Sequence, residues 1–296
     1  MKNNVCIIGA SVTSCILGIY LKKRGHKVIL LEKGAKIGGA WQVDNQGSIF
    51  SNIVAPINNN EVKNFSKVVK FLKGYGVKFN KEYQKALFTK RIIKVKSSDF
   101  RSLIKNSRKK LNIVYNYEVK NIKEYQKFVK INNKLVFDYI IHPKNVFVKY
   151  INIKGKKNFD TKIICNYDKV IKSKHLRFVC NKLNFNKIVF NENGIGPLDR
   201  LQIYSLKKNM KIINGRVKLN WKKRNKTDII REIKKIFGIK KIVSAKFAYY
   251  VSKKIPEKSF MKLKNKLKTS KRINYINTNS ITEFILENFI KKKFEL

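Results

Sequence analysis

The sequence predicts an α/β protein in which a parallel sheet, assembled from separate stretches of chain, carries an inserted strand-rich α+β domain. Three observations favour this class. The first forty residues alternate strand, helix and strand; strand-like segments fill the chain from about 146 to 254; and a strand at 273–276 precedes a capped final helix. Parallel strands joined by a helix are the unit from which such sheets are built.

Length and composition suit two folded domains with an unusually basic surface. The chain has 296 residues, 43% of them hydrophobic, and a net charge of +50. Such a charge suggests nucleic acid or an anionic membrane as a partner. The excess is almost all Lys and is spread along the chain, so a compositional bias toward Lys, Asn and Ile is the simpler explanation. Nucleic acid is thus disfavoured as a partner but left open.

The cysteines and histidines point to neither a metal site nor an exported protein. Four Cys form no CxxC pair and only three His are present, so we expect no metal. Cys6 and Cys15 lie in apolar segments, as buried thiols of a reducing compartment do. No apolar run reaches the roughly 18 to 20 residues of a transmembrane helix. We therefore expect a cytoplasmic protein with no transmembrane segment.

The N-terminal βαβ unit carries the chemistry of nucleotide binding. A buried strand over 5–9 leads into a helix over 11–24, and a second strand over 28–31 is followed by Glu32. The N-terminus of such a helix meets a pyrophosphate with free N–H groups and its dipole. An acid after the second strand accepts hydrogen bonds from a ribose hydroxyl, which is the role we assign to Glu32.

The turn between strand and helix departs from the usual glycine pattern, G-x-G-x-x-G. It reads Gly9-Ala10-Ser11-Val12-Thr13-Ser14, so only the first glycine is kept. Serine at the other two positions should crowd the backbone approach and the helix–strand contact, although a small hydroxyl can still cap the helix or bond a phosphate. We expect Gly9, Ala10, Ser11 and Ser14 to contact the nucleotide, but to bind it less tightly than the full glycine pattern would.

The residues after Glu32 sharpen this expectation. The run Glu32-Lys33-Gly34-Ala35-Lys36-Ile37-Gly38-Gly39-Ala40-Trp41 resembles the E-x5-G-G continuation of FAD-binding Rossmann oxidoreductases, the group that contains amine oxidases, phytoene desaturases, UDP-galactopyranose mutases and flavin monooxygenases. The resemblance implies a discontinuous FAD-binding Rossmann domain, with Lys33, Gly39, Ala40 and Trp41 beside the cofactor. The alternatives are an NAD domain or a plain α/β domain with a glycine turn, and core packing for Trp41.

Further segments follow the order of that family. Helices are predicted over 61–73 and 99–111, while 75–96 resist assignment. Short segments from 113 to 136 predict an antiparallel meander, and 137–141 a buried strand. In the resembling family a valine backbone before the meander holds the adenine, and the matching residue here is Val119. His142 ends the buried strand at the edge where ligands bind, although its place before Pro143 explains it equally well.

The middle of the chain predicts strands at 146–153, 163–164, 169–171, 176–179, 187–190, 201–204 and 243–251. One helix is expected over 227–237, starting from Thr227 or Asp228, and another from Pro256. In the resembling family such an insertion covers the flavin ring and holds the substrate. Arg200 is the candidate for an anionic substrate, with a local pair to Asp199 as the alternative. A capping box at 280–283 opens the final helix, and the family's Gly-Asp before that helix is replaced by Asn277-Thr278-Asn279.

The expected domains are residues 1–60, 97–145 and 270–296 for the FAD-binding Rossmann domain, and 61–96 and 146–269 for the substrate domain. The resemblance implies an FAD-dependent oxidoreductase that moves hydride or electrons between a small organic substrate and the flavin. No catalytic residue is expected to stand out, because the flavin carries the redox chemistry. Three alternatives stay open: a non-catalytic Rossmann protein that serves as a binding partner, a flavin-dependent mutase, and a polyanion-binding protein.

Overall fold

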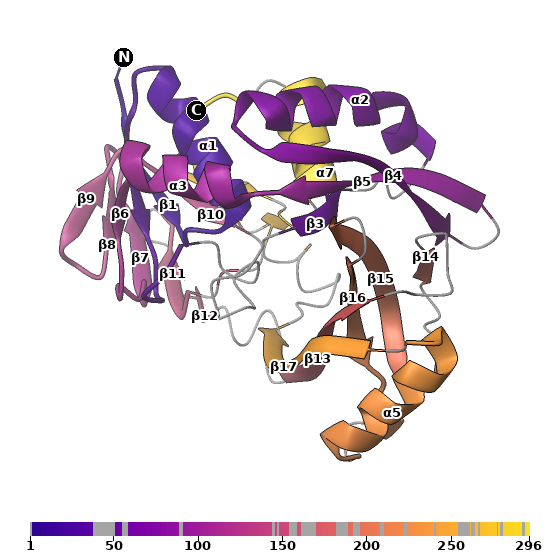
Figure 1. Cartoon of the computed structure of the whole chain (residues 1–296). Helices are drawn as coiled ribbons and strands as arrows, with labels where there is room; N and C mark the ends of the chain where they lie inside the picture. Colours follow the sequence, from indigo (N-terminus) through magenta and orange to yellow (C-terminus); the bar gives the residue numbers. More distant parts are fainter. Residues whose placement is uncertain are drawn as a thin grey trace.

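The structure is a computed structural model of the whole chain, drawn in Figure 1. The residues that it describes are 2–37, 51–54, 59–88, 91–143, 146, 148–153, 159–160, 170–181, 189–191, 196–207, 210–221, 224–239, 241–253, 261, 264–265, 267–276, 278, 281–291 and 294–296. Within these ranges the chain forms three sheets, of five, five and eight strands. The predicted α/β class is confirmed.

A parallel five-stranded sheet occupies the centre of the first domain, in the order β18-β10-β1-β2-β6. Its strands are apolar because both faces are covered. The chain leads from β1 to β2 and β6 on one side and to β10 and β18 on the other, so the strand order reverses between β1 and β10. The strands are β1 (Asn4–Ile8), β2 (Lys27–Leu31), β6 (Asn112–Val114), β10 (Tyr139–Pro143) and β18 (Ile273–Ile276).

Two sequence predictions about this sheet need correction. The segment 113–115 was expected in the antiparallel meander, but β6 pairs with β2 in parallel, because residues 116–120 turn the chain before the meander starts. The segment 137–141 is divided at Asp138. The Asp138 carboxylate accepts the Asn4 N–H at 2.6 Å, and this contact separates Phe137 of the meander from β10.

Helices cover one face of the parallel sheet. The apolar sides of these helices form one core with the sheet, which includes Leu17, Leu72, Leu103, Ile141 and Phe284. None of the described helices is long and apolar enough to cross a membrane. The helices are α1 (Val12–Lys23), α2 (Asn59–Gly74), α3 (Arg101–Lys110), and α7 (Ile281–Ile285), which continues as the π-helix η3 (Leu286–Lys291).

The two N-terminal cysteines lie on opposite sides of this sheet. Cys15 packs in the core with the helices, and Cys6 packs in the core on the other face. Both are free thiols and fully buried, as the sequence predicted. Burial raises the pKa of both thiols, to about 12 for Cys15, so neither is a reactive thiolate at neutral pH.

The antiparallel meander covers the other face of the parallel sheet (Figure 1). It is the core of a five-stranded sheet ordered β12-β11-β7-β8-β9, in which β11 joins β7 in parallel. Val148, Ile151 and Ile153 are buried in this core together with Ile140. The strands are β7 (Asn121–Glu124), β8 (Val129–Ile131), β9 (Leu135–Phe137), β11 (Tyr150–Asn152) and β12 (Phe159–Asp160).

A buried carboxylate ties the meander to the last strand of the parallel sheet. Glu124 is 2% exposed, and its Oε1 accepts the Ser270 hydroxyl at 2.8 Å and the N–H groups of Lys271 and Arg272 at 3.0 and 3.1 Å. Charge-assisted bonds of this kind are about twice as strong as neutral ones. They fix the entry to β18, which brings the C-terminal segment back to the first domain.

The third sheet has eight strands in the order β17-β13-β16-β15-β14-β4-β5-β3. The segment 75–96, which the sequence left unassigned, forms most of the β4–β5 hairpin. The two strands predicted at 169–171 and 176–179 correspond to one strand, described from Val170 on; they were separated because polar residues interrupt the apolar pattern. The predicted strand at 163–164 lies outside the described residues. The strands are β3 (Ser51–Val54), β4 (Lys78–Phe88), β5 (Arg91–Asp99), β13 (Val170–Asn181), β14 (Val189–Asn191), β15 (Leu198–Lys207), β16 (Met210–Val217) and β17 (Lys241–Lys253).

One helix, α5 (Lys226–Phe237), packs on this sheet through Ile229, Ile233 and Phe237, which contact Leu198 and Val217. A short 3-10 helix, η2 (Leu219–Trp221), precedes it. The cap of α5 is Asn225, whose Oδ1 accepts the Asp228 N–H at 2.7 Å, and not Thr227 or Asp228 as predicted. Most of the predicted helix after Pro256 lies outside the described residues.

Candidate functional site

The turn after β1 is built around the one glycine that the sequence retains. Gly9 has φ +84°, a conformation that side chains rarely adopt, and its N–H donates to the Leu31 carbonyl at 2.7 Å. A methyl group on Gly9 would lie 3.3 Å from the Val146 side chain. The turn therefore needs glycine for its backbone angle, and the chain that follows β10 passes close over it.

The two serines of the turn fit where the sequence predicted crowding. Ser11 caps α1 with φ −68°, an ordinary backbone angle, and its Oγ accepts the Ser14 N–H at 3.2 Å. The hydroxyl also lies 2.8 Å from Thr13 Oγ1 and 2.9 Å from Ser14 Oγ. Ser14 is fully buried. The turn thus adopts its shape without the second and third glycines, and its helix start carries three hydroxyls.

After these hydroxyls have formed their hydrogen bonds, some backbone N–H groups at the start of α1 remain available to an anion. The Ser14 N–H is capped, and Cys15 donates to the Ser11 carbonyl at 2.9 Å. The N–H groups of Val12 and Thr13, in the first turn, have no acceptor within the helix. They point along the helix axis toward the carboxyl edge of the sheet, where the positive end of the helix dipole favours a phosphate.

Glu32 brings a carboxylate to the same turn. Its Oε2 accepts the Ala10 N–H at 2.6 Å, and its Oε1 accepts the Gly34 N–H at 2.7 Å. The Glu32 backbone is held by β6, since its N–H donates to the Val114 carbonyl at 2.8 Å. A carboxylate can accept about four hydrogen bonds, so Glu32 keeps capacity for a ligand hydroxyl.

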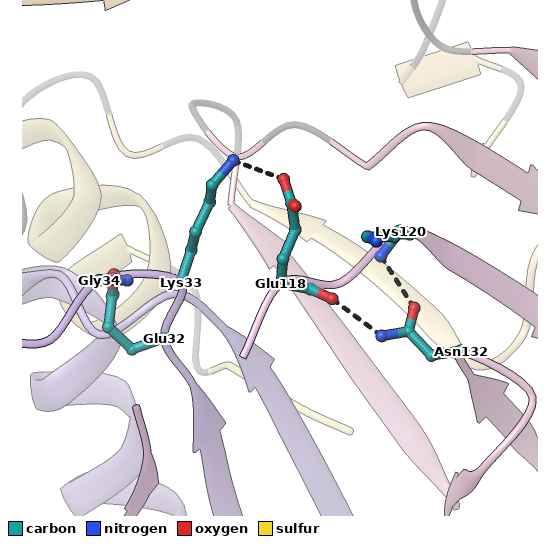
Figure 2. Close-up of polar contacts among 6 residues, drawn as sticks. All are labelled: Glu32, Lys33, Gly34, Glu118, Lys120 and Asn132. Atoms are coloured by element: carbon teal, nitrogen blue, oxygen red, sulfur yellow. Dashed lines mark hydrogen bonds and ion pairs between the residues drawn. The ribbon is translucent and has the colours of Figure 1, made fainter. Parts of the chain in front are cut away.

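Lys33 points away from Glu32 and forms an ion pair with Glu118, as Figure 2 shows. Both side chains are exposed, at 72% and 44%, so the pair adds little to stability. It does join the loop after β2 to the segment that enters the meander. The structure thus brings Lys33 next to the residue that precedes Val119.

Val119 lies between residues that one side chain holds in place. Asn132 Oδ1 accepts the Lys120 N–H at 2.8 Å, and its Nδ2 donates to the Glu118 carbonyl at 2.8 Å (Figure 2). The same Oδ1 accepts the Asn121 N–H at 3.1 Å. The side chain of Val119 is 5% exposed. Among the described residues, its backbone N–H and carbonyl have no hydrogen-bond partner. The fold therefore presents that peptide backbone at a fixed place.

His142 ends β10 at the point where the strand order reverses. It is 1% exposed; its Nδ1 lies 3.0 Å from the Pro143 carbonyl, while its Nε2 has no hydrogen-bond partner in the described part of the chain. Burial lowers the pKa of His142 to about 4, so the ring is neutral at physiological pH. Because the carbonyl can only accept, Nδ1 carries the proton and Nε2 is an unused acceptor. Open α/β sheets bind ligands at this reversal point.

Several predicted residues cannot be placed in the site. Gly39, Ala40 and Trp41 lie outside the described residues. Arg200 belongs to β15, where the pairing with β16 is irregular between Asp199 and Gln202, and the structure does not describe its side chain.

Sequence reasoning missed two features of the turn and its surroundings. Thr13 joins the hydroxyl group at the helix start, and the run Ser11-Val12-Thr13-Ser14 is the signal that marks it. Asn132 holds the segment around Val119 from the distant β8–β9 turn. Its backbone has φ +50°, and an Asn-Asn pair between two strands is the turn signal that could have found it.

Comparison with known proteins agrees with this geometry. Residues 7–60 match the family model described as an NAD(P)-binding Rossmann-like domain, which includes the Gly9 turn and Glu32. No curated protein sequence matches the chain. Solved structures do match over nearly its whole length, at low sequence identity.

Three of these structures illustrate the likeness. A redesigned putrescine oxidase is 8% identical with a TM-score of 0.63, covering 94% of this chain and 93% of its own. An FAD-dependent oxidoreductase from Pseudomonas aeruginosa is 12% identical with a TM-score of 0.56, covering 95% and 87%. A Pyrococcus furiosus protein is 14% identical with a TM-score of 0.58, covering 100% and 99%. At these identities the likeness establishes the fold.

Proposed function

We propose that this chain, which has the two-domain Rossmann fold of FAD-dependent oxidoreductases, binds FAD at the carboxyl edge of its parallel sheet and works as a flavin-dependent oxidoreductase. The observation that carries the proposal is the Gly9 turn. Its positive φ, the open N-terminus of α1 and the Glu32 carboxylate meet at one place, beside the reversal of strand order.

The residues at the turn fit the phosphates and the ribose of a dinucleotide. The N–H groups of Val12 and Thr13 and the hydroxyls of Ser11 and Thr13 can donate to phosphate oxygens. Glu32 retains lone pairs for the ribose hydroxyls, while its bonds to Ala10 and Gly34 keep the carboxylate at the turn. Ser14 is buried and acts within the helix, where it keeps Ser11 in its capping geometry.

The Val119 backbone fits the adenine. Its unpaired N–H and carbonyl offer one donor and one acceptor, which match the acceptor and donor edges of an adenine ring. Asn132 and the Lys33–Glu118 pair act as positioning groups, because they hold the peptides on either side of Val119. Lys33 is therefore proposed to support the site from outside it.

The chemistry follows from the bound group and its surroundings. The flavin supplies hydride or electron transfer, and the protein supplies binding, orientation and exclusion of water. We place a small organic substrate between the flavin and the eight-stranded sheet, with Arg200 of β15 as a candidate contact for an anionic one. Gly39, Ala40 and Trp41 are proposed to line the cofactor beyond Glu32.

The first experiment is to purify the protein without added cofactor, record its visible spectrum and identify any nucleotide released on denaturation. We expect a flavin spectrum with FAD in near-equal amount to protein. A colourless protein that takes up no added FAD would overturn the proposal and leave a binding role for the fold.

A matched pair of variants tests the assignment of Glu32. Glu32→Gln keeps the size of the side chain but removes the charge that strengthens its hydrogen bonds, so we expect the Kd for FAD to rise about tenfold or more. Glu287→Gln removes an exposed carboxylate of η3, which has no role in the proposed site, and should leave the Kd within about twofold. If the two substitutions change the Kd for FAD equally, Glu32 does not bind the ribose.

A further inference from the structure

Three neighbouring parts of the fold expose many cations and no acid. We define the basic surface as every Lys and Arg within residues 22–24, 67–78 and 105–110, at the end of α1, along α2 and its following loop, and along α3. All eleven side chains are exposed, and these ranges contain no Asp or Glu. None of the eleven forms an ion pair within the described part of the chain.

Direct contacts show that these three parts adjoin. Lys22 Nζ donates to the Lys110 carbonyl at 2.6 Å, which joins the ends of α1 and α3. The Lys23 ammonium lies 5.2 Å from the centre of the Tyr75 ring, which joins α1 to the end of α2. A methyl group on Gly76 would lie 3.1 Å from the Asn106 side chain of α3. The cations therefore form one continuous surface.

The basic surface is remote from the Gly9 turn along α1. That helix starts at the carboxyl edge of the sheet and has 12 residues, so it is about 18 Å long and its two ends lie far apart. At the margin of the basic surface the C-terminal segment brings a negative side chain, since Arg24 donates to the Phe294 carbonyl at 3.4 Å and Glu295 follows. Among the described residues, none of the eleven cations is paired with a carboxylate, so their mutual repulsion favours an external anionic partner.

We propose that the basic surface docks the protein on an anionic phospholipid membrane. The cations are mostly Lys, which acts as a flexible point charge, whereas nucleic-acid recognition favours the planar fork of Arg. They are also spread over three helical elements instead of following one line. Anionic lipids diffuse laterally and can match such a spread, while the phosphates of a duplex are held in two fixed rows.

The composition of the surface implies purely electrostatic binding. No exposed Phe, Trp, Ile or Leu occurs in the three ranges, since Phe71 and Tyr75 are half-buried and Leu72 is buried. Nothing in the surface would insert into the acyl chains. Binding should therefore require anionic lipid and weaken steeply with salt, as screening shortens the reach of the charges.

The experiment measures sedimentation of the full chain with vesicles of phosphatidylcholine, with and without phosphatidylserine, at rising salt. The variant Lys67→Gln, Lys70→Gln, Lys105→Gln and Lys109→Gln removes four charges from the basic surface. Its control removes four exposed charges elsewhere, by Lys120→Gln, Lys127→Gln, Lys134→Gln and Lys234→Gln. A third variant replaces the first four lysines by Arg and keeps the charge. Circular dichroism checks the fold of all three.

We expect the wild type to bind only vesicles that contain phosphatidylserine. At about fivefold per lysine, the surface variant should lose about 600-fold in partitioning, the control a few-fold, and the Arg variant almost nothing. Equal losses in the surface variant and the control would overturn the proposal in favour of net charge alone. A mixed-sequence RNA duplex is the competing ligand, and tighter binding of it through the same four lysines would also overturn the lipid assignment. None of these outcomes depends on bound flavin.

Discussion

At the residue scale, the Gly9 turn shows which glycines a turn of this shape requires and which ones are only common in it. Gly9 has a positive φ and a neighbour at 3.3 Å, so glycine is required there. Ser11 has an ordinary φ and Ser14 is buried in a helix start that accommodates it. Each glycine of the usual pattern thus meets a different steric requirement, and this chain keeps the one whose requirement is strictest, Gly9.

Gly9→Ala is expected to lower the free energy of unfolding by about 1–2 kcal/mol, because an L side chain is strained at this φ. FAD binding should weaken with it, since the turn must shift to relieve the contact with Val146. Gly74→Ala is the control, because a methyl group there meets nothing within 4 Å and α2 gains helix propensity. Denaturant titration of both variants checks this; equal destabilisation would contradict it.

His142 predicts a pH dependence of stability. The folded ring stays neutral down to its pKa of about 4, while the unfolded chain takes up this proton near pH 6.5. As pH falls through this window the unfolded state binds more protons, so the free energy of unfolding decreases, by at most about 3 kcal/mol. His142→Gln should remove that part of the pH slope in denaturant titrations. The same slope in the variant and the wild type would show that other groups cause it.

At the element scale, the meander shows how a turn can organise a site on another segment. Asn132 and Asn133 both have positive φ in the β8–β9 turn, but only Asn132 is seen to bond the 118–121 segment with its side chain. The short meander strands are apolar on one face and were predictable from their alternation. In the eight-stranded sheet, β17 was predicted over 243–251 and part of β15 over 201–204, but β4, β5 and β16 were missed, because polar residues interrupt the pattern that marks a strand.

Asn132→Ala is expected to lower the free energy of unfolding by about 2 kcal/mol and to raise the Kd for FAD several-fold, because two N–H groups and one carbonyl lose their partner. Asn133→Ala is matched to it, since both substitutions place Ala at a positive φ and only the first removes the three hydrogen bonds. Chemical denaturation and FAD titration of the pair isolate the effect of those bonds. If both variants behave alike, Asn132 does not position Val119.

At the scale of the whole molecule, the first domain is closed by chain that comes from far along the sequence. The strand β18 completes the parallel sheet, and Phe284 of α7 packs in the same core as Leu17 of α1. Figure 1 shows the C-terminal end of the chain beside α1. A ligand bound at the carboxyl edge of this sheet should therefore stabilise the entire domain.

If the chain binds FAD as proposed, FAD at 100 times its Kd should raise the free energy of unfolding by about 2.7 kcal/mol, because a ligand that binds only the folded chain stabilises it. Thermal unfolding with rising FAD should show a concentration-dependent increase in Tm, and Gly9→Ala should need more FAD for the same increase. NAD at the same concentrations is the control for general nucleotide effects. An equal shift with NAD would favour the alternative of an NAD domain.

The sequence by itself determined the βαβ start with its retained Gly9, the carboxylate at Glu32 after the second strand, the helix that ends at Gly238 and the α/β class. Each of these depends on residues close together in the chain, where apolar period and backbone preference act locally. Only the tertiary structure decided that β6 joins the parallel sheet, that His142 is buried with a free acceptor, and that Asn132 frames Val119. Those outcomes depend on which distant segments pack together, and the energy of that packing cannot be inferred from the residues of a single segment.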